Sequence, residues 1–505
     1  DRSGSRGLGD VYMRQAQGIV LLKNDRGVLP LSKDKSTVVI GPNGKALNTI
    51  SGGGSASMRP YHVVTPYDGI KSKVGKVDYT VGCYCDKALK NLFEFMTNDL
   101  DKSKKGVKAT FYTKAFENRD ASDKPIDEMI VDSSFVTLFD YSNPAVDSEK
   151  KLFYVDFEGY YTPDATADYK FGCQVFGTAL VYVDGKLLID NKTSQTKGTF
   201  CFSSGTVEET AVTHLEAGHS YKIKVEFGSG ITSKISSDFG SGGLQVGITK
   251  VIDPEIEVEH AAELAKSHDN VILCIGLNGE WESEGYDRAD MTLPGKTNDL
   301  VSAVLKANPN TVIVNQSGTP VEMPWLGESH TLLQAWYGGN EMGDALADIL
   351  FGDAVPSGKL SLSWPFKNQD NPAYLNFSTE MGRVLYGEDV FVGYRYYEKL
   401  QRRVAFPFGY GLSYTTFKFD DLKVSSDNTN VTVSFTVKNT GDKYTAKEVT
   451  QLYISAVESS VTRPDKELKA FAKPDLKPGE SKTVSFNLSW KMLAHSSMNT
   501  ETSGA

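Results

Sequence analysis

The stretch that decides the fold is residues 271–288, which read VILCIGLNGEWESEGYDR. Its first five residues form a short apolar run rich in β-branched side chains, and this predicts a buried strand at 271–275. The glycine-containing loop that follows holds four acidic residues. Open α/β sheets bind ligands at the carboxyl ends of their parallel strands. The segment therefore predicts an α/β layer with chemistry at the end of one strand.

Similar pieces extend outward from this strand in both directions. Apolar spacing predicts four helices, and short apolar runs predict two further strands. The predicted helices are 10–24, 257–267, 298–307 and 341–351, and the further strands are 37–40 and 311–314. Helices and strands that alternate in this way predict a mainly parallel sheet, built from residues 1–87 and 256–416.

Residues 88–255 have a different texture, with short alternating strands and Gly, Asp and Ser turns. Within them, residues 182–189 read YVDGKLLI, and the two-residue Asp-Gly turn is a strong hairpin signal. The α/β pattern is incomplete before this region and resumes after it. We therefore expect an all-β sandwich inserted into the α/β sandwich.

Residues 417–505 return to β-type patterning. Apolar side chains at Val431, Val433, Phe435 and Val437 alternate with polar ones before a turn at 439–441. This spacing predicts a fibronectin type III-like or immunoglobulin-like sandwich. Residues 498–505 are polar, so we expect a truncated or frayed end there. The fold class is multidomain.

Composition narrows the function. The chain has 505 residues, of which 40% are hydrophobic and 23% charged, as in soluble globular proteins of about three domains. Its 54 Lys and Arg against 64 Asp and Glu give a net charge of -10, which argues against a nucleic-acid partner. No apolar run approaches the roughly 20 residues of a membrane span. The start lacks both Met and an apolar signal core, so we expect a processing boundary there.

The cysteines and histidines give no sign of a metal or cofactor. Five cysteines, an odd number, lie mostly in apolar runs, where they are expected to be buried as small hydrophobic side chains. This favours a reducing, cytoplasmic compartment, although sequons at Asn376 and Asn430 leave secretion open. Neither the cysteines nor the seven histidines show metal-ligand spacing. His62 is expected only to pack, and Ser317 has no adjacent base.

The acidic loop admits two interpretations from its residues alone. It is either a solvated surface loop or a site at which carboxylates work on a glycosidic oxygen. Trp281 and Tyr286 favour the second, because sugar faces stack on aromatic rings. A second loop, Gly52–Gly54 followed by Ser55, would let the backbone approach a ligand closely. It lacks the Lys-Ser/Thr of a phosphate loop, and a plain surface turn is its other interpretation.

Several motifs together resemble glycoside hydrolase family 3 β-glucosidases over nearly the whole chain. Residues 283–288 (SEGYDR), followed by LPG at 293–295, are similar to the acid/base loop of that family. The other matching motifs are VLLKN at 20–24, LPL at 29–31, IGPN at 40–43, GGGS at 52–55, SGTPV at 317–321, PSGKL at 356–360 and PFGYGLSY at 407–414. The insert resembles the protective-antigen-type sandwich known from yeast and fungal members.

The resemblance implies roles for three residues. Glu284 matches the general acid/base, and Ser55 matches a residue beside the sugar in the -1 subsite. Phe202 matches an aromatic of the +1 subsite, where it would favour short substrates; packing in the core is the alternative for Phe202 and for Phe200 on the same predicted strand face. Glu280 and Glu282 share the loop and compete for the acid role. Asp287 and Arg288 are expected to fix the loop.

The resemblance also implies what the chain lacks. A retaining glycosidase needs two carboxyl groups about 5–5.5 Å apart. The family carries its nucleophilic Asp on an N-terminal (β/α)₈ barrel, which this sequence does not contain, so no nucleophile is named and a barrel domain is required as partner. The expected substrates are cellobiose, short oligosaccharides and aryl β-glucosides, with no cofactor. The alternatives are a carbohydrate-binding or adhesin-like module, or another family 3 activity such as β-xylosidase or a glycoside phosphorylase; homo-oligomerisation stays open.

Overall fold

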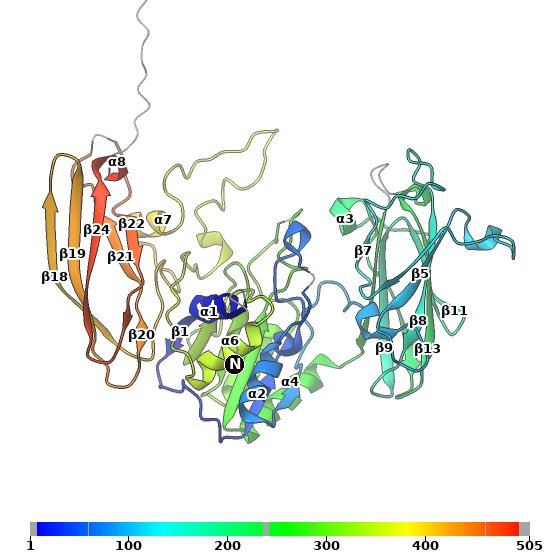
Figure 1. Cartoon of the computed structure of the whole chain (residues 1–505), viewed down its shortest axis with the longest axis horizontal. Helices are drawn as coiled ribbons and strands as arrows, with labels where there is room; N and C mark the ends of the chain where they lie inside the picture. The colour runs from blue at the N-terminus through cyan, green and yellow to red at the C-terminus, as the bar shows by residue number, and fades with distance from the viewer. Residues whose placement is uncertain (1–7, 59, 236–241, 286, 460, 494–505) are drawn as a thin grey trace, which may run out of the picture. The chain divides into compact units, whose positions relative to one another are not determined.

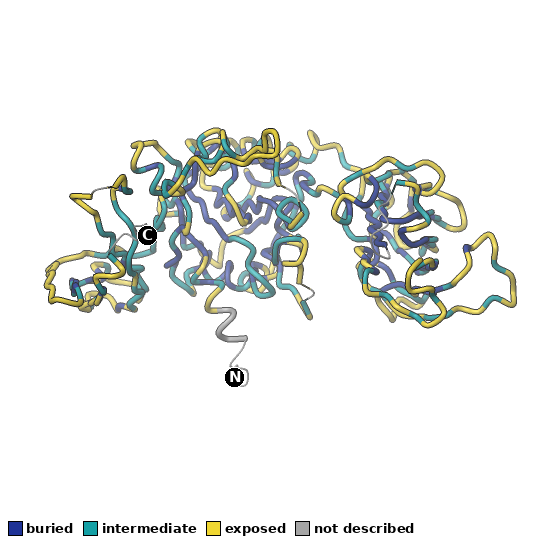
Figure 2. The backbone as a smooth tube through the Cα atoms, turned by 90° about the horizontal axis from the view of Figure 1, so that it is seen from above, coloured by how far each residue is buried: buried dark blue, intermediate teal, exposed yellow. Residues whose placement is uncertain are grey.

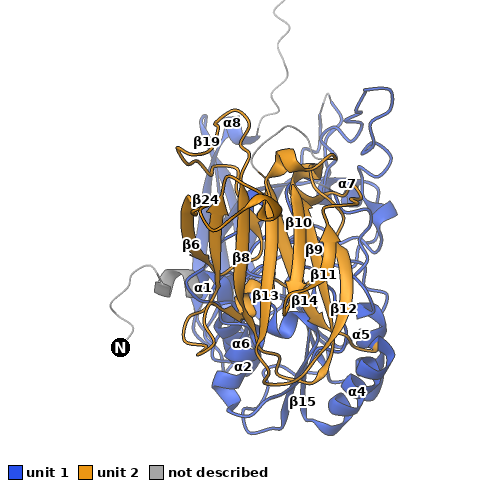
Figure 3. Ribbon diagram, turned by 90° about the vertical axis from the view of Figure 1, so that its right-hand side faces the viewer, with its two compact units in different colours: residues 1–85, 254–505 blue, residues 86–253 orange. Residues whose placement is uncertain are grey.

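The structure is a computed structural model that describes residues 8–58, 60–235, 242–285, 287–459 and 461–493. The chain divides into two compact units, residues 1–85 with 254–505 and residues 86–253 (Figure 3). The expectations for Tyr286 and for the end of the chain at 498–505 lie outside the described residues.

The first unit is built on a six-stranded sheet with the order β1-β17-β16-β15-β2-β3. Its strands are β1 (Val20–Asn24), β2 (Thr37–Ile40), β3 (Asp78–Thr80), β15 (Asn270–Gly276), β16 (Val312–Gln316) and β17 (Thr331–Gln334). All neighbours are parallel except β1, which runs antiparallel to β17. The prediction of a mainly parallel sheet is confirmed.

Helices cover both faces of this sheet (Figure 1). The helices α1 (Leu8–Gly18), α2 (Pro66–Val74) and α6 (Met342–Phe351) share one apolar cluster with Val39 and Leu333, whereas α4 (Pro254–Ser267) and α5 (Thr297–Ala307) share another with Val38 and Leu332. Neighbouring strand residues thus face opposite helices. The strands are consequently buried on both sides, which explains their continuous apolar runs. Buried residues are dark blue in Figure 2.

The helix predicted over 10–24 is wrong in its second half. The helix ends at Gly18, and residues 20–24 form strand β1 instead. Val20, Leu21 and Leu22 are fully buried, and β1 pairs with β17 along the edge of the sheet. A strand between two helical layers buries successive side chains on opposite faces. Packing in the folded sheet therefore outweighs the helical spacing of the apolar residues.

The second unit contains two antiparallel sheets around one apolar core. One sheet has the order β11-β10-β13-β8-β5-β6 with β4 paired to β8, and the other has the order β12-β9-β14-β7. The strands are β4 (Met96–Thr97), β5 (Val107–Tyr112), β6 (Asp127–Val131), β7 (Val136–Thr137), β8 (Tyr154–Tyr161), β9 (Ala167–Phe176), β10 (Thr178–Val183), β11 (Lys186–Asn191), β12 (Glu209–Leu215), β13 (Tyr221–Gly228) and β14 (Gly243–Lys250). The predicted hairpin is confirmed, because β10 and β11 pair across Asp184 and Gly185.

The segment around Phe202 differs from the prediction. Residues Phe200–Ser203 form one helical turn, α3, rather than a strand, and Cys201 and Phe202 have φ angles of 49° and 56°. Phe200 is buried, whereas Phe202 is 61% exposed. Left-handed backbone at non-glycine residues costs about 1–2 kcal/mol each and leaves no trace in the pattern of apolar residues. The two aromatics therefore do not share a strand face.

The C-terminal region of the first unit is again antiparallel. Its three sheets have the orders β18-β19-β24, β20-β23 and β21-β22. The elements are β18 (Phe417–Ser426), β19 (Asn430–Asn439), β20 (Ala446–Lys447), β21 (Thr450–Ile454), β22 (Glu467–Ala472), β23 (Asp475–Leu476) and β24 (Ser481–Ser489), with the short helices α7 (Tyr394–Lys399) before them and α8 (Trp490–Leu493) after them. The ion pair between Lys359 and Glu448, with N and O 3.2 Å apart, ties this region to the α/β part.

The five cysteines are free thiols in the structure. Cys83, Cys85, Cys173 and Cys274 are buried, as expected for small hydrophobic side chains. Within the described ranges, no helix is both long and apolar enough to cross a bilayer.

Candidate functional site

The predicted acidic loop lies at the carboxyl edge of the parallel sheet, directly after β15. There it meets the glycine-rich loop that follows β2. The backbone N–H of Gly53 donates to the carbonyl of Glu282 at 2.9 Å, and Gly53 forms a parallel bridge with Ser283. Two loops about 230 residues apart in sequence are thus joined by backbone hydrogen bonds into one wall, and the resulting site combines Glu284 with Ser55.

The Glu284 carboxylate is exposed and is held by Ser55. Its Oε2 accepts a hydrogen bond from the backbone N–H of Ser55 at 2.9 Å. Hydrogen bonds from the hydroxyl and the N–H of Ser55 lower the pKa of Glu284 below its ordinary value, because they stabilise the ionised form. In this structure Glu284 is therefore a carboxylate with a fixed direction, facing solvent.

Gly54 is required for this approach. It has a φ angle of +69°, and a Cβ placed on it would lie 2.5 Å from the Cβ of Glu284. Any side chain at this position would therefore displace Glu284 as well as strain the backbone. The glycine run at 52–54 thus leaves room for the Glu284 side chain of the same chain.

The Glu282 carboxylate, two residues earlier, has a different environment. Its Oε2 accepts from the backbone N–H of Gly318 at 2.7 Å and from the hydroxyl of Tyr337, while its Oε1 accepts from the hydroxyl of Thr319. Burial, followed by the nearby charge of Glu282, raises the pKa of Tyr337, which therefore stays protonated and donates a hydrogen bond to Glu282. With three donors on it, Glu282 anchors the acidic loop to the loop that follows β16.

The loop after β16 is fixed by hydrogen bonds with buried side chains of β16 and β17. The side-chain amide of Asn315 donates to Ser317 Oγ at 2.9 Å and to Gln334 Oε1 at 2.6 Å, and all three residues are buried. The hydroxyl of Ser317 donates to the carbonyl of Thr319 at 2.8 Å. Ser317 is therefore a structural residue, in agreement with the absence of an adjacent base in the sequence.

Trp281, Arg288 and the backbone of Glu280 hold the shape of the acidic loop. The indole N–H of Trp281 donates to the carbonyl of Cys85 at 2.6 Å, and its ring packs against the core of the α/β part. Arg288 donates to the carbonyl of Pro320 at 3.0 Å, as expected for a residue that fixes the loop. Asp287 is exposed, and Glu280 donates its backbone N–H to Asn278 Oδ1 at 2.9 Å.

Sequence reasoning missed Tyr337 and Thr319. Thr319 lies in the SGTPV motif at 317–321, and Tyr337 follows the carboxyl end of β17, so both stand at the edge where ligands of α/β sheets bind. Their place after the carboxyl ends of two predicted or observed strands was the signal that could have identified them. Phe202 lies in the other unit of the chain, so its proposed place at the +1 subsite remains a prediction.

His62 does more than pack, because its Nε2 lies 2.5 Å from Glu341 Oε1. Within the described ranges, no group of three or more His, Cys, Asp or Glu side chains is placed to hold a metal ion.

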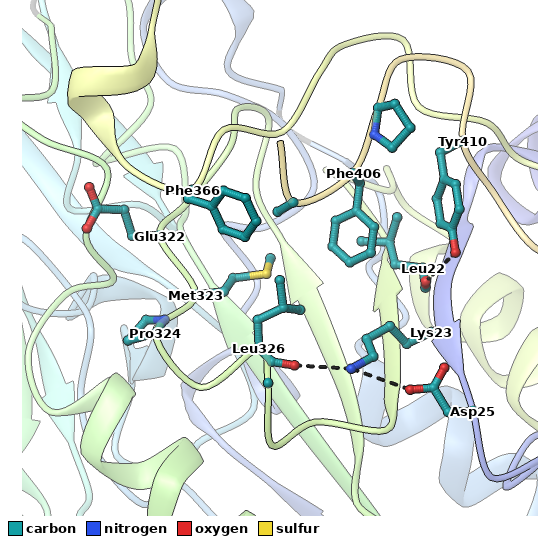
Figure 4. A pocket seen from close by; sticks show the side chains of 13 residues that line it. Leu22, Lys23, Asp25, Glu322, Met323, Pro324, Leu326, Phe366, Phe406 and Tyr410 are labelled. Atoms are coloured by element: carbon teal, nitrogen blue, oxygen red, sulfur yellow. Dashed lines mark hydrogen bonds and ion pairs between the residues drawn. The ribbon is translucent and has the colours of Figure 1, made fainter. Parts of the chain in front are cut away.

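A hollow lies elsewhere in the first unit (Figure 4). It has a volume of about 720 Å³. Lys23 crosses it, with its Nζ 3.1 Å from the carbonyl of Leu326 and 3.4 Å from Asp25 Oδ2. Its lining residues are Leu22, Lys23, Asp25, Glu322, Met323, Pro324, Leu326, Gly327, Phe366, Ala405, Phe406, Pro407 and Tyr410. Neither Glu284 nor Ser55 is among them, so this hollow is separate from the candidate site.

Comparisons with known proteins agree with the motifs. Residues 19–414 match the glycosyl hydrolase family 3 C-terminal domain, and residues 448–502 match a fibronectin type III-like domain. A β-glucosidase of Kluyveromyces marxianus is 56% identical over 483 residues, which are 94% of this chain and 57% of that protein. A putative β-glucosidase of Schizosaccharomyces pombe is 47% identical, with the same two shares.

Solved structures give the same result. The crystal structure of the Kluyveromyces marxianus β-glucosidase in complex with glucose superposes with a TM-score of 0.93 at 54% identity, over 97% of this chain and 58% of that one. The chain thus spans somewhat over half the length of the relatives it matches. On the family match over residues 19–414, this chain belongs to glycosyl hydrolase family 3.

Proposed function

We propose that this chain is the acid/base-bearing part of a retaining β-glucosidase. The complete enzyme would remove terminal non-reducing β-D-glucosyl residues from cellobiose, short oligosaccharides and aryl glucosides. One observation carries the proposal: the exposed Glu284 carboxylate stands at the carboxyl edge of the sheet, oriented by the N–H of Ser55. The relatives' shared name of β-glucosidase supports the choice of sugar.

The proposed chemistry needs a second carboxylate. In a retaining mechanism one carboxylic acid protonates the leaving oxygen while a carboxylate about 5–5.5 Å away attacks the anomeric carbon, and the acid then serves as base for water. Glu282 is unsuited to the attack, because three donors hold its carboxylate. We propose that the nucleophile comes from a (β/α)₈ barrel domain in the part of the relatives that this chain does not match.

The proposed domain organisation follows from the same reasoning. The α/β sandwich would comprise residues 1–87 and 256–416, the inserted protective-antigen-type sandwich residues 88–255, and the fibronectin type III-like domain residues 417–505. The compact unit at 86–253 and the two antiparallel sheets within it support the insert.

The test of the proposal uses this chain fused behind the unmatched part of the Kluyveromyces marxianus relative, named here the joined protein. In the chain alone the pKa of Glu284 should lie below its ordinary value, because Ser55 stabilises the carboxylate. A general acid must instead carry its proton near the working pH. A second carboxylate and burial in the joined protein should both raise this pKa.

The measurement is a carboxyl-carbon NMR titration of both proteins, with the Glu284 signal assigned by its loss in Glu284→Gln. An upward shift on joining is expected. If the pKa of Glu284 is the same in both proteins, no second carboxylate lies beside it and the proposed mechanism is wrong.

Gly54→Ala should lower the activity of the joined protein by about 10- to 100-fold, because the new methyl group displaces Glu284. Gly27→Ala is the matched control, since Gly27 also has a positive φ angle, +62°, but nothing lies within 4 Å of its added Cβ. Both variants carry the backbone strain, and only Gly54→Ala carries the collision. Equal losses of kcat/KM in the two variants would assign the effect to strain and remove Gly54 from the site.

The exposed ring of Phe202 suits a residue that meets substrate, and we propose that it borders the +1 subsite. Phe202→Ala in the joined protein should then weaken the preference for disaccharide over longer substrates several-fold, at little cost in stability. The check is the ratio of kcat/KM for cellobiose and cellotetraose. An unchanged ratio in a protein with unchanged Tm would exclude this role.

A carbohydrate-binding or adhesin-like module is the alternative from another class. Binding alone does not require a carboxylate oriented as Glu284 is, so this alternative has less support. No described feature favours β-xylosidase or glycoside phosphorylase activity, and the relatives' names do not suggest either.

A further inference from the structure

Residues 372–392, named here the arm, expose an unusual run of large apolar side chains. Leu375, Met381 and Tyr386 are 90%, 96% and 87% exposed. The arm's other exposed members are Tyr374, Phe377, Val384, Leu385 and Val392. Scattered apolar residues are normal on a protein surface, but so many large exposed ones within one short segment make the segment a candidate interaction site.

The arm has a defined local shape. Glu380 and Arg383 exchange backbone hydrogen bonds of 3.0 and 2.9 Å around a tight turn, in which Met381 and Gly382 have φ angles of 51° and 75°. Further turns join Asn376 to Ala373 and Asp389 to Tyr386. Figure 1 shows the arm as a yellow loop that extends away from the rest of its unit. These hydrogen bonds join residues of the arm to one another and give its backbone a defined course.

The base of the arm contacts the wall that carries the acidic loop. The side-chain amide of Asn371 lies 3.4 Å from the sulfur of Met291, and the backbone N–H of Asn368 donates to Glu322 Oε1 at 2.9 Å. Glu322 in turn donates its N–H to the carbonyl of Met291 at 2.7 Å. Met291 is seven residues after Glu284 in the same loop. The base of the arm therefore contacts the same loop, after β15, that carries Glu284.

The position of Glu284 and the lengths of the relatives indicate which domain binds the arm. A domain that brings a nucleophile to about 5–5.5 Å from Glu284 has to stand over the carboxyl edge of the sheet, within reach of the arm. The relatives carry further sequence beyond the 57% that this chain matches. We propose that the arm is the docking surface for the nucleophile-bearing domain of the same polypeptide. This inference rests on the proposed function.

Amide hydrogen exchange of residues 372–392, compared between this chain alone and the joined protein, tests the docking. We expect the arm to exchange about tenfold or more slowly in the joined protein. Leu385→Ser combined with Tyr386→Ser should remove most of this protection. Leu422→Ser combined with Val424→Ser is the matched control, because these β18 side chains are 69% and 64% exposed and lie outside the arm.

Each outcome decides the inference separately from the proposed function. Arm exchange that is equally fast in both proteins would overturn the docking, even if the joined protein hydrolyses glucosides. Protection that instead grows with the concentration of this chain alone would assign the arm to a second copy and would also overturn it. Arm protection in a joined protein without activity would uphold the docking and contradict the proposed function.

Discussion

Glu284→Ala in the joined protein is expected to depress cellobiose turnover by about 10²- to 10⁴-fold, the usual contribution of a general acid. The sugar oxygen that leaves cellobiose is basic and needs a proton as its bond breaks. Nitrophenolate leaves without one, so kcat/KM for a nitrophenyl glucoside should fall far less. The check is kcat/KM for both substrates with wild type and variant, because kcat/KM reports on the first step, in which the leaving group departs.

The same variant should respond to azide. Without Glu284 no base activates water for the second step, and the glycosyl-enzyme should persist. A small anion needs no deprotonation to attack it. Azide should therefore restore part of the rate for the nitrophenyl glucoside and yield glucosyl azide. Failure of any anion to do so would contradict the base role.

Glu282→Ala is the control, and the structure gives it a different expected result. It removes the acceptor for Gly318, Thr319 and Tyr337, so the loop should loosen. Turnover of both substrates should then fall together, without rescue by azide. If Glu282→Ala instead shows the leaving-group dependence and the rescue, the acid/base is Glu282 and the motif alignment is displaced by two residues.

The contrast between the two carboxylates shows what the sequence could and could not predict. The apolar run at 271–275 placed an acidic loop at a strand end, and the SEGYDR motif singled out Glu284. The donors on Glu282 could not be found in the same way. Tyr337 stands 55 residues further along the chain, and only the parallel order of β15, β16 and β17 brings the two together.

The mistaken elements have a similar origin. The strand β1 exists because residues 20–24 complete the edge of a sheet whose other strands come from distant sequence. The turn at Phe200–Ser203 depends on positive φ angles at non-glycine residues, which surrounding structure has to enforce. Local periodicity contains neither constraint. The predictions succeeded where an element's own residues determine it, as in the hairpin at Asp184 and Gly185.

The largest expected effect concerns the chain by itself. Enzymes accelerate reactions by about 10⁶-fold or more, and a retaining glycosidase without its nucleophile cannot form the covalent intermediate. The 505-residue chain should therefore hydrolyse aryl β-glucosides only at the background rate, whereas the joined protein should be active.

Absence of activity has to be distinguished from absence of folding. The chain alone should show a cooperative thermal transition, because its two units have apolar cores of their own. A side-by-side assay at equal concentration, with Glu284→Ala of the joined protein as reference, separates the cases. Since nitrophenolate leaves without a proton, that variant should keep measurable activity on the nitrophenyl glucoside, while the chain alone should have none. Robust hydrolysis by the chain alone would mean that a carboxylate within these 505 residues attacks the sugar, and Asp287, exposed three residues after Glu284, would then be the first to replace.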